Sequence, residues 1–188
     1  MRRRISIPVD ILRIIVGHLG KADLVTICLL NKVCCSCAQD VLYRNMKVVG
    51  PNACRTLSTS PHLARRVRLF LFSLDDPLST DSAIPVYYAN ATLATALRNM
   101  TSHRKLALFI GGDSDILDGC ASKLEVLSAD FACDKSFRKF LNSHPGLKSV
   151  SILTECNDFS DLEATCLPNL TEVTAWFLRS HTLFRGAR

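Results

Sequence analysis

Long apolar runs are missing from this sequence of 188 residues. The stretch from Ser6 to Gly20 follows the basic start MRRR and has the outline of a secretory signal, which needs about 7 to 15 uninterrupted apolar residues and a small-residue cleavage site. Pro8, Asp10 and Arg13 interrupt this stretch, and no such cleavage site follows. No segment approaches the ~18 apolar residues of a membrane span. We therefore expect a soluble, cytoplasmic or nuclear protein with no membrane partner; a signal anchor is the alternative.

The sequence also lacks the patterns of metal, cofactor and catalytic sites. Of nine cysteines, only Cys34 and Cys37 have the spacing of a zinc knuckle, and no second pair follows; buried free thiols in a reducing compartment are the preferred interpretation. The segment GGDSDILDG, residues 111–119, fits neither a phosphate loop nor an EF-hand, which leaves a polar connection. His62 and His144, each beside a proline, are expected in loops. We predict no catalytic residues, no metal, no cofactor and no enzymatic activity.

Positive charge exceeds negative charge, but it is not concentrated in one segment. The net charge is +6, from MRRR, from ARRVR at 64–68, from HRK at 103–105 and from the C-terminal tail. No stacking aromatic residues interleave with these groups, as they would in a nucleic-acid groove. We interpret them as a solvated basic surface and expect no nucleic-acid partner.

The apolar spacing is helical from Ile7 to about Tyr43. Pro8 suits the first turn of a first helix, Asp23 is a plausible N-cap of a second, and a third begins near Asn31. One stripe of the first helix holds Ile11, Leu12, Ile15, Val16 and Leu19. Three helices this short cannot enclose much apolar surface by themselves, so we expect a second polypeptide to cover the surplus.

After residue 50 the pattern becomes that of strands with a recurring frame. VRLFLF at 67–72 alternates as a strand does, and a leucine frame recurs in LEVLSA, LKSVSI and LTEVTA. Their first residues, Leu124, Leu147 and Leu170, follow one another at intervals of 23 residues, and a weaker copy starts 21 residues earlier at His103. This spacing is typical of leucine-rich repeats, in which each unit adds one strand and a helical return. Helical returns are predicted in DKSFRKFLNSHP and between Val86 and Met100.

These patterns together predict an α/β fold in two parts. Residues 1–48 form a three-helix module, and residues 49–188 form a right-handed stack of imperfect leucine-rich units. The stack ends without the polar capping unit that a solenoid needs, which leaves a C-terminal truncation open. A mixed α/β layer of unrelated units is the competing interpretation.

The first region resembles an F-box. The matching positions are Ile7, Pro8, Asp10, Ile11, Leu12, Ile15, Leu19, Asp23, Leu24 and Leu30. The sequence departs from the family pattern at Val33 and Cys34, where the family tends to have Arg and a large aromatic residue. STSPHLARRVR and HPGLKSVSI extend the resemblance to fungal F-box proteins that carry loose leucine-rich units.

This resemblance implies a substrate-recognition subunit of a Skp-cullin-F-box ubiquitin ligase. It implies docking on a Skp-type adaptor, and through it on a cullin scaffold, by Ile7, Pro8, Ile11, Leu12, Ile15, Leu19 and Leu24. The repeats would recruit an unidentified protein substrate, with Trp176 either an anchor on that face or a packing residue of the last repeat. The alternative is a repeat protein, unconnected to a ligase, whose basic surface binds nucleic acid or acidic lipid.

Overall fold

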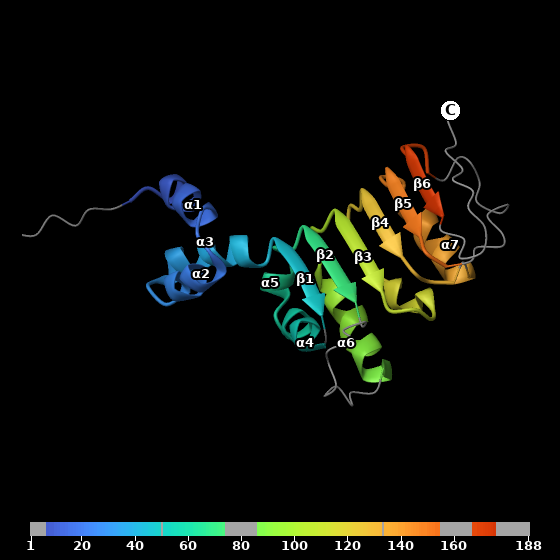
Figure 1. The fold of residues 1–188 in the computed structure, drawn as a ribbon, viewed down its shortest axis with the longest axis horizontal. Helices are drawn as coiled ribbons and strands as arrows, with labels where there is room; N and C mark the ends of the chain where they lie inside the picture. The colour runs from blue at the N-terminus through green and yellow to red at the C-terminus, as the bar shows by residue number, and fades with distance from the viewer. Residues whose placement is uncertain (1–6, 50, 74–85, 133, 155–166, 176–188) are drawn as a thin grey trace, which may run out of the picture.

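The protein is a mixed α/β structure in which a three-helix module stands at one end of a six-stranded parallel sheet (Figure 1). The computed structural model describes residues 7–49, 51–73, 86–132, 134–154 and 167–175. The module comprises α1 (Val9–Gly17), α2 (Lys21–Cys28) and α3 (Lys32–Leu42). The sheet region comprises β1 (Asn45–Val49), α4 (Pro51–Thr59), α5 (Pro61–Ala64), β2 (Leu69–Ser73), α6 (Val86–Asn99), β3 (Lys105–Phe109), the 3-10 helix η1 (Ser114–Leu117), β4 (Val126–Ala129), α7 (Lys135–Asn142), β5 (Ser149–Ile152) and β6 (Glu172–Ala175).

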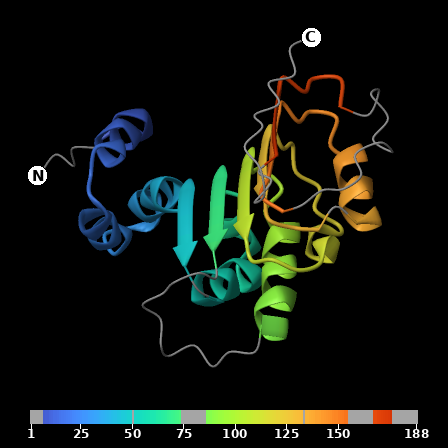
Figure 2. The same ribbon diagram turned by 45° about the vertical axis from the view of Figure 1, so that its right-hand side comes forward.

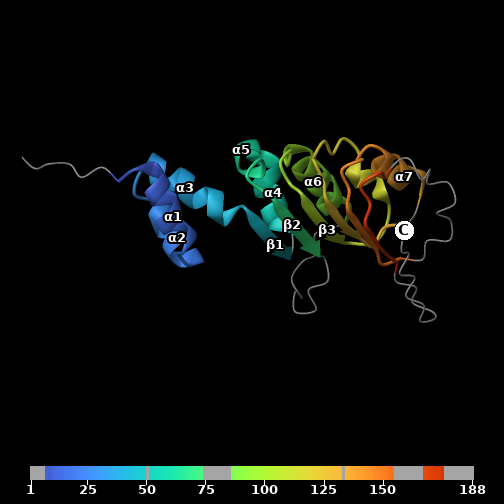
Figure 3. The same ribbon diagram turned by 90° about the horizontal axis from the view of Figure 1, so that it is seen from above.

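The strands lie side by side in chain order, and every neighbouring pair is parallel. Because a parallel partner cannot be reached by a tight turn, each strand is followed by a return segment before the next one starts. The α-helices α4 to α7 all lie on the same side of the sheet, as the view from above shows (Figure 3). Among the described residues, one face of the sheet is therefore covered by return segments and the other carries no helix (Figure 3).

The register of the sheet matches the predicted interval of the leucine frame. Leu127 of β4 is paired with Val150 of β5, and Val150 with Val173 of β6, so each step advances by the 23 residues found in the sequence. Leu106 pairs with Leu127, which is the predicted interval of 21 residues. The interval between the leucine frames in the sequence therefore predicts which residues are paired in neighbouring strands.

The main core lies between the sheet and its return segments. Alternate strand residues point inward, as in β2, where Phe70 and Phe72 are buried and their neighbours are only half-buried. One column of the core lies two residues before each strand and contains Tyr43, Val67, His103, Leu124, Leu147 and Leu170. His103 therefore occupies a position that an apolar side chain fills in the neighbouring units.

The helical module has a small core of its own. Val16 of α1, Leu24 of α2, and Cys37 and Ala38 of α3 form a separate buried cluster. α3 is capped by Asn31, whose side-chain oxygen accepts a hydrogen bond from the Cys34 amide at 2.9 Å. The third helix thus begins where the sequence predicted.

Arg66 ties the module to the sheet region. Its guanidinium donates to the Ser36 carbonyl at 2.9 Å and forms an ion pair with Asp40, both on α3. α3 also leads almost directly into β1, with Tyr43 packed against the main core. Figure 2 shows the module beside β1 and well separated from the later strands.

Several expectations need correction. The second helix begins at Lys21 with Gly20 as its N-cap, so Asp23 lies in the first turn instead; Pro8 is the N-cap of α1 and not part of its first turn. β1 places the start of the sheet inside residues 1–48, which were expected to be purely helical. α4 was not predicted either; among its described side chains only Cys54 and Leu57 are fully buried, with Ala53 packed partly against the core.

Two further expectations concern polar segments. Residues 111–119 are not simply a polar connection, since η1 buries Ser114, Ile116 and Leu117. His144 lies in the loop between α7 and β5, as expected, but it is buried there, with its Nδ1 2.8 Å from the Phe140 carbonyl oxygen. In both segments a polar side chain is buried, and its hydrogen-bond partner lies within the fold: Asp134 for Ser114, and the Phe140 carbonyl for His144. His62 was also expected in a loop, but it lies in the short helix α5.

Candidate partner-binding surfaces

Apolar side chains on and beside α1 divide into a buried group and an exposed group. Leu12 and Val16 on the helix, and Leu19 just after it, pack in the core of the module. Ile11, Ile14 and Ile15 on the helix, and Ile7 just before it, have exposed fractions of 49%, 60%, 45% and 53%. These four residues are three or four positions apart, or adjacent, so they share one helix face. We call this set the α1 outer face.

The structure divides the expected docking residues into two groups. Ile7, Ile11 and Ile15 are on the α1 outer face, and Pro8 beside them is exposed. Leu12 and Leu19 are partly buried against the module core, and Leu24 is only 2% exposed inside it. The stripe predicted from sequence is therefore only partly available for docking, because Leu12, Val16 and Leu19 pack inward whereas Ile11 and Ile15 stay exposed. Ile14, which the prediction left out, is the most exposed residue of the outer face.

A second apolar group lies around the turn between α2 and α3. It consists of Val25, Leu29, Leu30 and Val33, of which Leu29 is 83% exposed and Leu30 67%. We call it the α2–α3 corner. Apart from Val9 and Val173, all the large hydrophobic residues that are exposed among the described residues belong to these two groups. Concentration of exposed apolar side chains on one small module is typical of a protein-protein interface.

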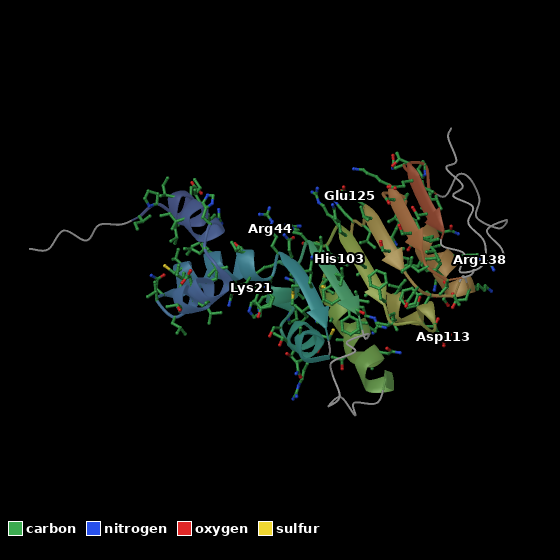
Figure 4. The ribbon with its side chains drawn as sticks, in the orientation of Figure 1. Lys21, Arg44, His103, Asp113, Glu125 and Arg138 are labelled. Atoms are coloured by element: carbon green, nitrogen blue, oxygen red, sulfur yellow. The ribbon has the colours of Figure 1, made fainter. Side chains whose placement is uncertain are left out.

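The edge of the sheet where the strands begin carries a row of polar residues, five of them charged. Each residue directly precedes a strand: Arg44, Arg68, Arg104, Glu125, Lys148 and Thr171. Backbone hydrogen bonds of 2.8 to 2.9 Å join each of these residues to the previous one, so the six are neighbours across the sheet. Arg44 and Glu125 can be followed along this edge in Figure 4. These basic residues are scattered along the sequence, but strand pairing places three arginines from separate segments next to one another.

The two halves of this row differ in charge compensation. Glu125 lies 3.3 Å from Arg104 on one side and 3.3 Å from Lys148 on the other. Arg68 donates a hydrogen bond to the Ser102 carbonyl at 2.9 Å, and Arg44 has no ionic partner within the described residues. Lys47 and Lys105 add two exposed ammonium groups beside the arginines. The β1–β3 half of the edge is therefore strongly positive.

His103, Cys120 and Ser122 form a buried polar cluster that sequence spacing did not reveal. The Cys120 Sγ lies 3.9 Å from His103 Nε2 and 3.8 Å from the Ser122 hydroxyl, while His103 Nδ1 bonds the Met100 carbonyl. Burial lowers the pKa of His103 to about 4, against the opposing effect of the Met100 carbonyl, and burial raises the pKa of the Cys120 thiol. A Cys-His nucleophile needs the opposite shifts, so this cluster is arranged as neutral core packing.

Other candidates from the sequence give no site. Cys37 and Cys54 are buried, while Cys28, Cys34 and Cys35 are half-buried, and all five are free thiols. Within the described ranges, no three His, Cys, Asp or Glu side chains gather as metal ligands would. Trp176, proposed as a possible anchor for a substrate, lies outside the described residues. None of the helices in the described part of the chain is both long enough and apolar enough to cross a bilayer.

Three surfaces can therefore carry a function: the α1 outer face, the α2–α3 corner, and the row of Arg44, Arg68 and Arg104, which we call the arginine row. Comparison with known proteins found no match: no family model matches the chain, and no curated protein matches it either.

Proposed function

We propose that this chain is the target-recruiting subunit of a ubiquitin ligase of the Skp-cullin-F-box type. In this proposal α1 to α3 form an F-box that docks on a Skp-type adaptor, and the sheet region is a short stack of leucine-rich units that binds a protein target. The ligase chemistry belongs to other subunits, and the chain itself catalyses no reaction. The adaptor and cullin place the assembly inside the cell, in the cytoplasm or the nucleus.

The observation that carries this proposal is the exposed α1 outer face. Leu12, Val16 and Leu19 already supply the contacts that hold α1 to its own module. The four outer isoleucines make no comparable contribution, since each keeps between 45% and 60% of its surface exposed. An amphipathic surface helix normally has one apolar stripe, so a second stripe calls for a second partner.

The exposed apolar surface of the module is large enough to contribute to docking. Covering the exposed half of one isoleucine side chain stabilises a complex by about 1 kcal/mol, so the α1 outer face offers roughly 4 kcal/mol before association costs. The more exposed Leu29 and Leu30 of the α2–α3 corner offer more per residue. Arg66 holds α3 against the sheet region, so a partner bound to the module would be held in a fixed relation to the sheet.

The test is co-purification of the full chain with a Skp-type adaptor. We expect the double variant Ile11→Asp, Ile15→Asp to lose the adaptor, because docking would bury two carboxylates in an apolar interface. Each site loses about 1 kcal/mol of burial and adds about 1 to 3 kcal/mol of desolvation, which together weaken binding by roughly a thousandfold or more.

Val173→Asp is the matched control, since Val173 is 47% exposed and lies on β6, far from the module. It should leave adaptor binding unchanged. Circular dichroism would establish that each variant folds, and Ile11→Ser, Ile15→Ser would replace the acidic pair if that variant does not. Equal co-purification of the wild type and a folded double variant would rule out docking through α1.

A further inference from the structure

We propose that the arginine row binds an anionic segment of the target protein, in which phosphate or carboxylate groups lie close together. The binding surface consists of Arg44, Arg68 and Arg104, with Lys47 and Lys105 beside them on the outer face of the sheet. This proposal rests on the proposed function in one respect: it takes the sheet region as the part that recruits the target. It does not depend on adaptor docking.

The three arginines are neighbours because backbone hydrogen bonds join the starts of adjacent strands. The amide of Arg68 bonds the Arg44 carbonyl at 2.9 Å, and that of Arg104 bonds the Arg68 carbonyl at 2.8 Å. The three residues therefore follow one another at about the 4.8 Å spacing of adjacent strands. Like charges on directly opposed residues destabilise a sheet, and an anion placed over them would relieve this repulsion.

An acidic side chain neutralises the edge of the sheet over β3 to β5 but not over β1 and β2. Glu125 is 3.3 Å from both Arg104 and Lys148, so a single carboxylate serves the β3–β5 part of the edge. Over β1 and β2 no carboxylate among the described residues pairs with Arg44 or Arg68. Arg66, the nearby arginine that does have a partner, is turned toward Asp40 on α3 instead.

The guanidinium groups of the arginine row are suited to an anionic ligand. Arginine presents its donors as a planar fork that matches phosphate or carboxylate oxygens in pairs. Arg44, Arg68 and Arg104 are exposed, and the Arg104 side chain is 65% exposed even with its ion pair. A segment of extended chain laid along this edge can present anionic side chains to each guanidinium in turn.

The extent of the surface favours a peptide over a nucleic acid. The arginines span only two strand spacings, roughly 10 Å, before the sign of charge changes at Glu125. Nucleic-acid binding draws on many phosphate contacts along a longer basic track and on aromatic platforms. Beside the arginine row, the outer face carries small and aliphatic side chains such as Leu71, Ala107 and Ser128, and the half-buried Phe109 lies at the opposite end of β3 from Arg104.

The test is titration of the full chain with fluorescent peptides, followed by anisotropy. The probes are a peptide of alternating phosphoserine and glycine, an all-glutamate peptide of the same length, and a neutral serine-glycine peptide. We expect at least one anionic peptide to bind and the neutral one not to. The tighter of the two anionic peptides identifies phosphate or carboxylate as the preferred group.

Arg44→Glu is the main variant, because the Arg44 side chain is exposed and makes no hydrogen bond or ion pair within the described residues. We expect about tenfold weaker peptide binding, the size of one lost charge-assisted hydrogen bond. Arg68→Glu should act alike, and Lys47→Glu replaces it if loss of the Ser102 contact impairs folding. The matched control is Arg55→Glu, an equal change of charge at an exposed position of α4, which should not alter peptide binding.

Several results would overturn the proposal. Failure of both anionic peptides to bind would do so, as would equal weakening by Arg44→Glu and Arg55→Glu, which would indicate a response to net charge alone. Tighter, Arg44-dependent binding of a single-stranded oligothymidylate or of phosphatidylserine vesicles would replace the peptide with another class of partner. Adaptor co-purification should be normal in Arg44→Glu, so a failure of peptide binding and a failure of adaptor docking can be told apart.

Discussion

The buried imidazole of His103 should make the stability of this protein depend on pH from about 6.5 downward. His103 is fully buried in the column between Val67 and Leu124. Its Nδ1 bonds the Met100 carbonyl oxygen, which leaves Nε2 as the site of protonation, 3.9 Å from the Cys120 sulfur. A proton at Nε2 would place a positive charge in the apolar core.

The sign follows from the lowered pKa. Burial lowers the pKa of His103 from 6.5 to about 4, with the Met100 carbonyl opposing the shift and His144 adding to it. The unfolded chain therefore binds a proton below pH 6.5 that the folded chain accepts only near pH 4. Stability falls across this window, by about 2 kcal/mol at pH 5 and about 3 kcal/mol at pH 4.

The perturbation is His103→Leu, and the assay is urea unfolding followed by circular dichroism at a series of pH values. At pH 7 the variant should be less stable by about 1 kcal/mol, because the Met100 carbonyl loses its partner. Leucine is the residue that fills this column in the next two units, at Leu124 and Leu147, so its volume is accommodated. Between pH 6.5 and 4 the variant should lose far less stability than the wild type and become the more stable of the two.

The control is His62→Gln, which changes an exposed histidine on α5 and should leave the pH dependence unaltered. Carboxylates such as Asp134, whose pKa is lowered from 3.8 because its burial is outweighed by hydrogen bonds from Ser114 and Phe137, are present in both proteins and therefore cancel from the comparison. If His103→Leu shows the same slope between pH 6.5 and 4 as the wild type, His103 is not the group responsible and the account of its burial is incorrect.

Two further predictions concern contacts between units. Asp134→Ala should lower the free energy of unfolding by about 1 to 2 kcal/mol, because Asp134 accepts the Phe137 amide at 2.7 Å and the Ser114 hydroxyl at 2.6 Å; thermal unfolding measures this, and Asp113→Ala, at an N-cap without a side-chain bond, should change it little. Arg66→Ala should loosen α3 and speed amide hydrogen exchange there, at a cost of about 1 kcal/mol; unchanged exchange in α3 would contradict this.

The leucine frame illustrates what can be predicted from a repeating pattern. Because the strands are parallel and follow chain order, the interval between frames is also the step between paired residues, as from Leu127 to Val150. A period visible in the sequence thus becomes a register. The same logic fails for β1 and β2, where the paired residues Arg44, Arg68 and Arg104 are separated by unequal lengths of chain that no period relates.

The α1 helix illustrates a different limit. Its apolar residues cover two sides, and sequence alone assigns Ile11 and Leu12 to one broad stripe. Only the packing of α3 against α1 decides that Leu12 turns inward and Ile11 remains exposed. Helical periodicity fixes the angle between side chains, but it does not fix which angle faces the neighbouring helix.

By itself, the sequence determined that this chain has a short helical region followed by strands in repeating frames, since both properties are written in the local spacing of apolar residues. The tertiary structure decided which apolar stripe of α1 stays uncovered, that three distant arginines form one row, and that His103 enters the core. These depend on contacts between segments far apart in the chain, whose geometry is set by strand pairing and helix packing and leaves no local pattern.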